Sequence, residues 1–339
     1  MARLTRRDVL KLGSAAALCG AIPNLSMSQS KIILGQGEFQ YEWVPNFLKP
    51  PQGLSFGDTH GLAQDSAGRF YLAHTVGAGS TSSDAVLVYN EDGSFKTSWG
   101  ASFKGGAHGL DIRKEGNEEF LYHCDTARCL VVKTTLEGEI VWQRGVPEEA
   151  GVYKDGKRYV PTNVAFGPEG RLFVGDGYGS SYIHIYDAAG NYIKTFAGAG
   201  KDPGLTSSPH GLTVDVRGPN PLLYVADRSN RRIQVFDMDG KHVRFHTDGM
   251  RLPCHFDFQG DLVLVPDLQS VVTLLDEKSQ PIVHLGDGDP TNLRGKPTSD
   301  FIPGKFIHPH DAIFTRLGDI LVAEWVPQGR VTLLRRVRS

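Results

Sequence analysis

The sequence predicts an all-β fold, a six-bladed β-propeller, from three observations. Short segments that open on histidine or asparagine recur six times, at steps of 45 to 55 residues. Each is followed by strand-like apolar runs bounded by Gly, Asn, Asp or Pro. The chain of 339 residues has 40 glycines and 19 prolines for turns and shows no long amphipathic helical pattern. A repeat near fifty residues with four strands is typical of a propeller blade. The six opening residues are His60, His108, Asn163, His210, His255 and His310.

The blade unit is clearest after His210, where four runs follow in order: GLTVD, LLYVAD, RIQVFD and HVRFH. After His310 only three such runs remain before the chain ends. The stretch FQYEWVPNF, residues 39–47, alternates like a strand ahead of the first blade. We predict that it becomes the outer strand of the last blade and closes the ring, because this removes an exposed sheet edge.

Residues 1–30 are predicted to be a twin-arginine signal peptide and linker, and residues 31–339 the propeller. TRRDVLK from Thr5 is a twin-arginine pattern, and the apolar run after it is too short to span a bilayer. We therefore expect passage through the twin-arginine export machinery to the periplasm or beyond, and no membrane span in the mature protein. Cys124 and Cys129 flank a predicted hairpin, either as a disulfide or as two separate thiols.

The charge of the chain excludes one class of partner. The net charge is -2, and acidic and basic residues are mixed along the sequence. No basic stripe of the kind that binds nucleic acid is present. We expect a monomer that acts on a small polar or peptide-like substrate.

The repeated histidines indicate a metal site. Inner strands of a propeller all start around one channel, so residues at their beginnings converge at one mouth. Three neutral imidazoles with an open position suit Zn²⁺, and a carboxylate with backbone carbonyls suits Ca²⁺. The alternative is that each histidine has only a structural role, bonds a backbone carbonyl, and recurs because the repeat motif recurs. His60, His255, His308, Asn163 and Thr75 are candidates for an additional pocket beside the metal.

A second set of side chains, at the ends of the second strands, is predicted at the same mouth. These residues are His74, Asp125, Asp176, Asp227, Asp267 and Glu324. We expect the carboxylates to stand behind the imidazoles, as partners of metal-bound histidines do. Turn capping is the alternative for Asp125 and Asp267.

Residues 55–339 resemble the NHL-type repeat, and four blades resemble the lyase domain of peptidylglycine amidation. The second resemblance rests on AHGLDI, PTNVAFGPEGRLFVGDGYGSSYIHIYDAAGNYIKTF, PHGLTVD with LLYVADRSNRRIQVFD, and HPHDAIF. It implies a six-bladed propeller with catalytic zinc on His108, His210 and His310. It implies structural calcium on Asp311 and the backbone carbonyls of Leu62 and Leu110. Tyr178 would be the catalytic tyrosine and Arg228 an active-site arginine.

The resemblance implies zinc-assisted cleavage of the C–N bond of a carbinolamide. The chain departs from the family at Thr75, where the family has a second arginine. A threonine cannot replace a guanidinium that binds a carboxylate, so the substrate of this chain can differ from that of the family. A non-catalytic propeller that binds a peptide, glycan or protein partner is one alternative. A lactonase-like or streptogramin-lyase-like propeller enzyme is the other, although such sites are richer in carboxylate and asparagine.

Overall fold

The computed structural model describes residues 31–288 and 293–338. The chain divides into residues 1–31 and a second, compact unit, Ile32–Ser339. The twin-arginine pattern therefore lies outside the described residues, and export stays a prediction. Within the described ranges no helix is both long and apolar enough to cross a membrane.

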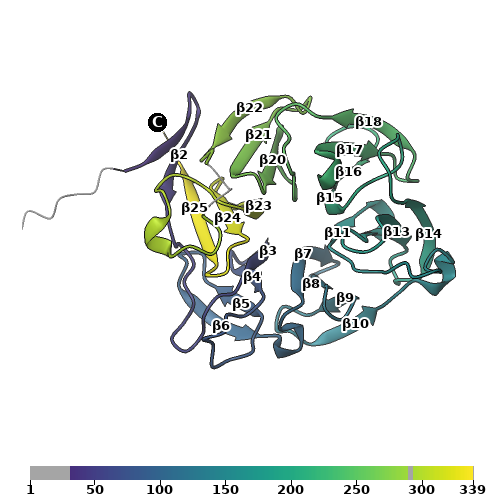
Figure 1. Cartoon of the computed structure of the whole chain (residues 1–339), viewed down its shortest axis with the longest axis horizontal. Coiled ribbons are helices and arrows are strands. Elements are labelled where there is room, and N and C mark those ends of the chain that lie inside the picture. The colour runs from purple at the N-terminus through teal and green to yellow at the C-terminus, as the bar shows by residue number, and fades with distance from the viewer. Residues whose placement is uncertain (1–30, 289–292, 339) are drawn as a thin grey trace, which may run out of the picture. The chain divides into compact units, whose positions relative to one another are not determined.

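The second unit is a six-bladed β-propeller, which confirms the predicted fold class. Six antiparallel sheets stand around one axis with their first strands innermost (Figure 1). The first three blades are β3 to β6 (Thr59–Gln64, Phe70–His74, Val86–Tyr89, Phe95–Trp99), β7 to β10 (Ala107–Glu115, Glu118–Asp125, Leu130–Thr134, Ile140–Arg144) and β11 to β14 (Asn163–Phe166, Leu172–Gly175, Tyr182–Tyr186, Tyr192–Ala197). The next two are β15 to β18 (Pro209–Asp215, Leu222–Asp227, Arg232–Phe236, His242–His246) and β19 to β22 (Asp257–Gln259, Leu262–Asp267, Val271–Leu275, Pro281–Leu285).

The last blade is built from both ends of the unit, as the strand count predicts. It contains β23 (Pro309–Phe314), β24 (Ile320–Glu324), β25 (Arg330–Arg336), β2 (Phe39–Val44) and β1 (Ile33–Gln36). The closing strand β2 pairs antiparallel with β25. Strand β1, which the sequence pattern did not predict, adds a fifth strand outside β2.

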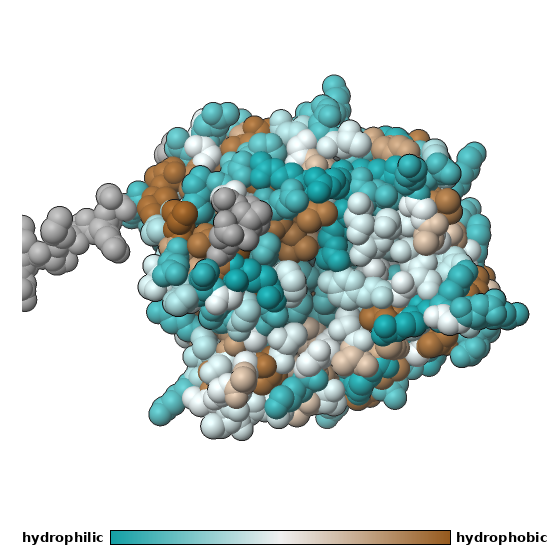
Figure 2. Space-filling view, viewed as in Figure 1, coloured by the Kyte–Doolittle hydropathy of each residue, from teal (hydrophilic) through white to brown (hydrophobic). Residues whose placement is uncertain are grey.

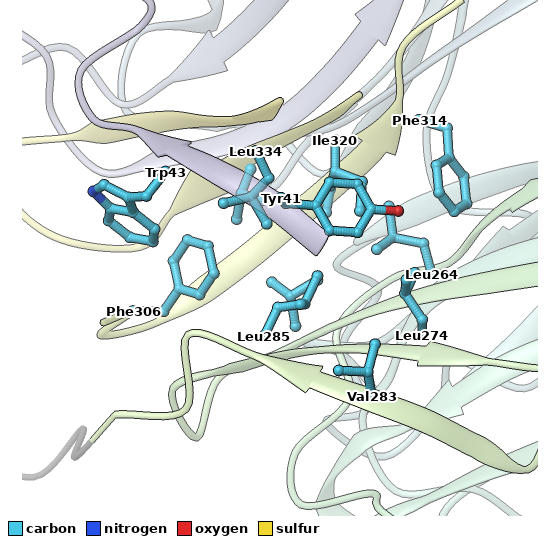
Figure 3. Close-up of a cluster of buried hydrophobic side chains, with 13 residues drawn as sticks. Tyr41, Trp43, Leu264, Leu274, Val283, Leu285, Phe306, Phe314, Ile320 and Leu334 are labelled. Atoms are coloured by element: carbon cyan, nitrogen blue, oxygen red, sulfur yellow. The ribbon is translucent and has the colours of Figure 1, made fainter. Parts of the chain in front are cut away.

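Buried aromatic residues fix the closing strand in place. Tyr41 is 0% exposed and Trp43 is 6% exposed. Both belong to an apolar cluster with residues of the fifth and sixth blades, and the Trp43 ring lies 4.8 Å from that of Phe306 (Figure 3). Because this cluster joins two blades, the strand secures the ring as well as its own sheet. The face seen in Figure 2 is mainly hydrophilic, with apolar residues in separate patches.

Candidate metal centre

Four histidines from four blades occupy the same place in their inner strands. His60, His108, His210 and His310 are each the second residue of β3, β7, β15 and β23. In each strand the register with its neighbour shifts around the histidine. Such a bulge bends a strand and re-aims a side chain. The repeat thus delivers four imidazoles to one mouth of the channel, as the sequence predicts.

Three of these histidines are each followed by a glycine, which allows the inner strand of the next blade to come close. A Cβ on Gly61 would lie 2.5 Å from the Leu110 amide nitrogen. A Cβ on Gly109 would lie 2.3 Å from the Thr162 carbonyl oxygen, and one on Gly211 would meet the next blade at a similar distance. These distances are below any ordinary contact, so only glycine fits. The His-Gly pair therefore brings the inner strands close enough for their imidazoles to meet.

The four imidazoles form one buried cluster. None of the four residues is more than 5% exposed. Five of their ring pairs have centroids 4.6 to 4.9 Å apart. One nitrogen from each of His60, His108 and His310 lies within 4.8 Å of the others, a spacing suited to holding a metal ion. The cavity at the cluster has room, about 10 Å³, for one ion or one water molecule.

Two of the rings are oriented by backbone carbonyls of the next blade. Nδ1 of His108 donates to the Thr162 carbonyl at 2.8 Å, and Nδ1 of His210 donates to the Cys254 carbonyl at 2.9 Å. Burial lowers the pKa of His108 to about 4 and that of His210 well below its usual value. Both rings are therefore neutral near pH 7, with their Nε2 lone pairs facing the cluster. This is the state in which imidazole binds a metal.

The hydroxyl of Tyr178 completes the cluster. It lies 3.1 Å from Nε2 of His108 and 3.1 Å from Nε2 of His210. Since both nitrogens present lone pairs, a single O–H can satisfy only one of them. A cation beside these three atoms would satisfy all of them, so the donor set fits a metal. Arg228 approaches the same hydroxyl, with Nη1 3.4 Å away.

A second layer of polar groups lies along the inner strands next to the histidine cluster. The Asp311 carboxylate accepts from the Leu62 amide at 2.8 Å and from Nδ1 of His255 at 2.6 Å. Burial alone would lower the pKa of His255, but the charges of Asp311 and Asp111 raise it to about 9. Nε2 of His255 lies 3.9 Å from Asp111 Oδ2. Burial raises the pKa of Asp111 to about 7.

These contacts do not fit the implied calcium ion. Calcium takes six to eight oxygen ligands. The carboxylate of Asp311 instead bonds the imidazole Nδ1 of His255 at 2.6 Å. Its two oxygens also accept backbone amides from Leu62 and Ala312. The contacts of Asp311 therefore give no support to the implied calcium site.

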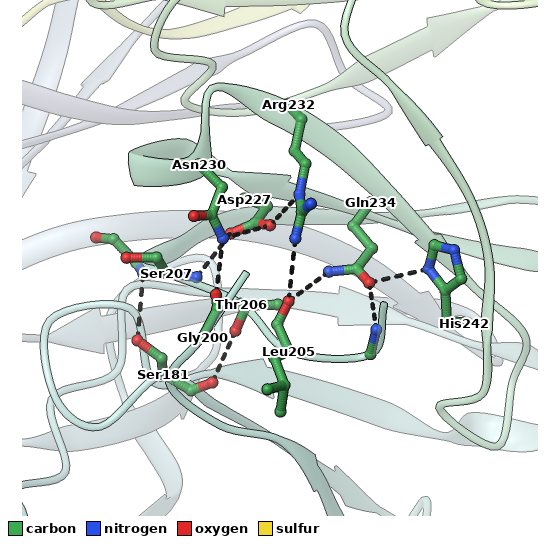
Figure 4. Close-up of polar contacts among 12 residues, drawn as sticks. Ser181, Gly200, Leu205, Thr206, Ser207, Asp227, Asn230, Arg232, Gln234 and His242 are labelled. Carbon is green, nitrogen blue, oxygen red and sulfur yellow. Dashed lines mark hydrogen bonds and ion pairs between the residues drawn. The ribbon is translucent and has the colours of Figure 1, made fainter. Parts of the chain in front are cut away.

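The carboxylates at the ends of the second strands do not contact the imidazoles, and that prediction is wrong. Four of them accept a backbone N–H, at 2.6 to 2.7 Å, from the loop that leads into the inner strand of their own blade. The pairs are Asp176 with Val160, Asp227 with Ser207, Asp267 with Leu252, and Glu324 with Ile307. Asp227 also binds Asn230 and Arg232 (Figure 4). Backbone carbonyls orient His108 and His210, and the carboxylates hold the loops that lead into the inner strands.

The remaining candidates for an additional pocket have separate roles. Asn163 lines the cavity, and its Oδ1 accepts from the Leu212 amide at 3.4 Å, which links two inner strands. His308 donates from Nδ1 to the Leu268 carbonyl at 2.6 Å, outside the four-imidazole cluster. His255 belongs to the second layer.

Thr75 lies near an arginine that the sequence did not single out. Its amide donates to the Asp58 carbonyl at 3.0 Å, and the Asp58 carboxylate binds Arg294 at 2.8 Å. The Arg294 guanidinium lies over the Trp325 ring, 3.6 Å from its centroid, and its charge contributes to the lowered pKa of His60. Arg294 comes from the segment between β22 and β23, so no blade repeat could predict it.

The cysteines of the described residues are free thiols. Cys124 on β8 lies opposite Val131 rather than Cys129, which occupies the turn with a φ of 58°. The disulfide alternative is therefore wrong in this structure. Cys254 lines the cavity, and burial raises the pKa of its thiol to about 12.

The fold and the site define a six-bladed β-propeller with a buried histidine group at its channel. No family model matches the chain. A mouse (Mus musculus) relative, NHL repeat-containing protein 3, is 26% identical over 161 residues, 45% of this chain and 45% of its own length. Peptidyl-alpha-hydroxyglycine alpha-amidating lyase 1 of Drosophila melanogaster is 28% identical over 348 aligned positions, 90% of this chain and 61% of that protein.

Among solved structures, a streptogramin B lyase has a TM-score of 0.58 and 12% identity, covering 88% of this chain and 99% of that one. This likeness shows the fold alone. The chain spans about half the length of the first curated relatives it matches. The protein is thus a six-bladed β-propeller that resembles NHL repeat-containing proteins and the peptidyl-α-hydroxyglycine α-amidating lyases.

Proposed function

We propose that the protein is an exported zinc-dependent lyase that breaks the C–N bond of a carbinolamide. The observation that carries this proposal is the convergence of buried, neutral imidazoles with the Tyr178 hydroxyl. The Nε2 lone pairs of two imidazoles face this hydroxyl, and its single proton can satisfy only one of them. His108, His210 and His310 would hold the zinc ion. The similarity to the Drosophila lyase over 90% of the chain supports the reaction type.

The reaction converts an N-acyl-α-hydroxyglycine into an amide and glyoxylate. The substrate hydroxyl loses its proton, its oxygen forms the carbonyl of glyoxylate, and the C–N bonding electrons leave with the nitrogen. The nitrogen then takes a proton to become the amide. Bound zinc would supply positive charge that stabilises the deprotonated hydroxyl.

Tyr178 is positioned to move the proton. Its hydroxyl lies at the histidine nitrogens, while the rest of the residue is 41% exposed at the mouth, where a substrate can reach it. Burial raises the pKa of Tyr178, although the neighbouring Arg228 opposes this shift. A phenol that keeps its proton at neutral pH can donate it to the departing nitrogen and then take up the proton that the substrate hydroxyl loses.

Arg228 is positioned to bind the substrate carboxylate. Its Nη2 bonds Ser208 Oγ at 3.3 Å, and its Nη1 lies beside the Tyr178 hydroxyl. A guanidinium held in this way binds a carboxylate through charge-assisted hydrogen bonds. Thr75 cannot supply a second guanidinium. Arg294 lies close to Thr75, because both residues donate hydrogen bonds to Asp58. The substrate we propose is a small polar or peptide-like molecule with a carboxylate.

The test is glyoxylate release from an N-acyl-α-hydroxyglycine by zinc-loaded protein. We expect turnover by the unaltered protein, loss of turnover in His210→Ala, and little change in His308→Ala, which alters a histidine outside the cluster. A zinc-loaded protein that releases no glyoxylate would refute the lyase proposal. This result would instead favour a non-catalytic propeller that binds a peptide, glycan or protein partner.

A further inference from the structure

His60 differs from the other histidines of the cluster in the direction that its ring faces. His108 and His210 turn Nδ1 outward to a carbonyl of the next blade. His60 instead points Nδ1 inward, 3.5 Å from Nε2 of His310. Its ring also lies 4.8 Å from that of His108, and the residue is 5% exposed. His60 therefore presents a nitrogen to the same small cavity as its neighbours.

The separation of the two nitrogens matches that of two ligands on one ion. Two nitrogens that each lie about 2.1 Å from a tetrahedral zinc ion are about 3.4 Å apart. The observed 3.5 Å is close to this value and is long for an N–H···N hydrogen bond.

We propose that His60 is a fourth metal ligand, so that the resting centre has four imidazoles and no open position. This inference rests on the proposed function, since it concerns the same ion. A closed shell of four protein ligands is typical of structural zinc, whereas a catalytic site keeps one position free. The substrate hydroxyl must therefore displace one imidazole before the reaction.

His60 is less firmly anchored than His108 and His210. Like His310, it has no ring bond to a backbone carbonyl among the described contacts, whereas His108 bonds Thr162 and His210 bonds Cys254. Partners of this kind fix the orientation of a ligating histidine and strengthen its binding. Displacement of His60 would open one position on the zinc ion for the substrate hydroxyl.

The test is zinc K-edge X-ray absorption, which counts imidazole ligands without relying on turnover. We expect four imidazoles in the unaltered protein, and three imidazoles with one oxygen in His60→Ala. His308→Ala, a matched control at the same mouth, should keep four. His60→Asn, which retains a polar side chain, replaces His60→Ala if that variant does not fold.

The outcomes separate this inference from the proposed function. Three imidazoles in the unaltered protein, with no change in His60→Ala, would overturn the fourth ligand and leave the lyase proposal standing. A protein that binds no zinc at any loading would overturn both. Retention of four imidazoles in His60→Ala would also overturn the assignment of His60.

Discussion

Closure of the ring by the N-terminal strand predicts that one side chain on β2 stabilises the whole propeller. Trp43→Ala removes an indole that is 6% exposed and packs against Phe306 at the junction of two blades. Truncation of a buried Trp to Ala costs about 3–5 kcal/mol. At about 2 °C per kcal/mol for a large domain, the melting temperature should fall by about 6 to 10 °C.

The assay is thermal and urea unfolding of the variant beside Ile33→Ala. Ile33 lies on β1 of the same hairpin and is 44% exposed, so its truncation should change the free energy of unfolding by no more than about 0.5 kcal/mol. A single cooperative transition at lower temperature is expected for Trp43→Ala. Equal stability of the two variants would refute the closure argument.

Three further predictions concern the site and the second layer of polar groups. Tyr178→Phe should lower glyoxylate release at least about 100-fold while zinc content and melting temperature stay unchanged; an unchanged rate would remove Tyr178 from proton transfer. His255→Leu leaves the buried Asp311 carboxylate without its charged partner, so urea unfolding at pH 7 should show a loss of about 3–5 kcal/mol. His255 has a pKa of about 9 in the folded state and about 6.5 when unfolded, so its contribution is complete below pH 6.5 and declines as pH rises through 9. Stability should therefore fall between about pH 6.5 and 9 in the unaltered protein and much less in His255→Leu. Parallel curves for the two proteins would contradict the pairing.

The repeat made the fold predictable. Blade number, the inner strands and the closing strand follow from a fifty-residue period and from the missing fourth strand after His310. The sequence did not predict strand β1, because its residues are mostly exposed and show no alternation of apolar side chains. Its position depends on pairing with β2, which is a tertiary contact.

The site was predictable only in part. Convergence of His108, His210 and His310 follows from their equivalent positions in the repeat. The carboxylates were misassigned because sequence position places Asp227 at the mouth but does not say whether it binds an imidazole or the amide of Ser207. Arg294 was missed because its position depends on the fold of a connecting segment.

The claim on which the account depends is that imidazoles from separate blades hold one metal ion. Its most direct test is the zinc content of protein purified without chelator, for the unaltered chain and for the double variant His108→Ala/His310→Ala. The account predicts about one zinc per chain for the first and almost none for the second, with folding checked by melting temperature. Zinc absent from the unaltered protein, or retained in full by a folded double variant, would contradict it.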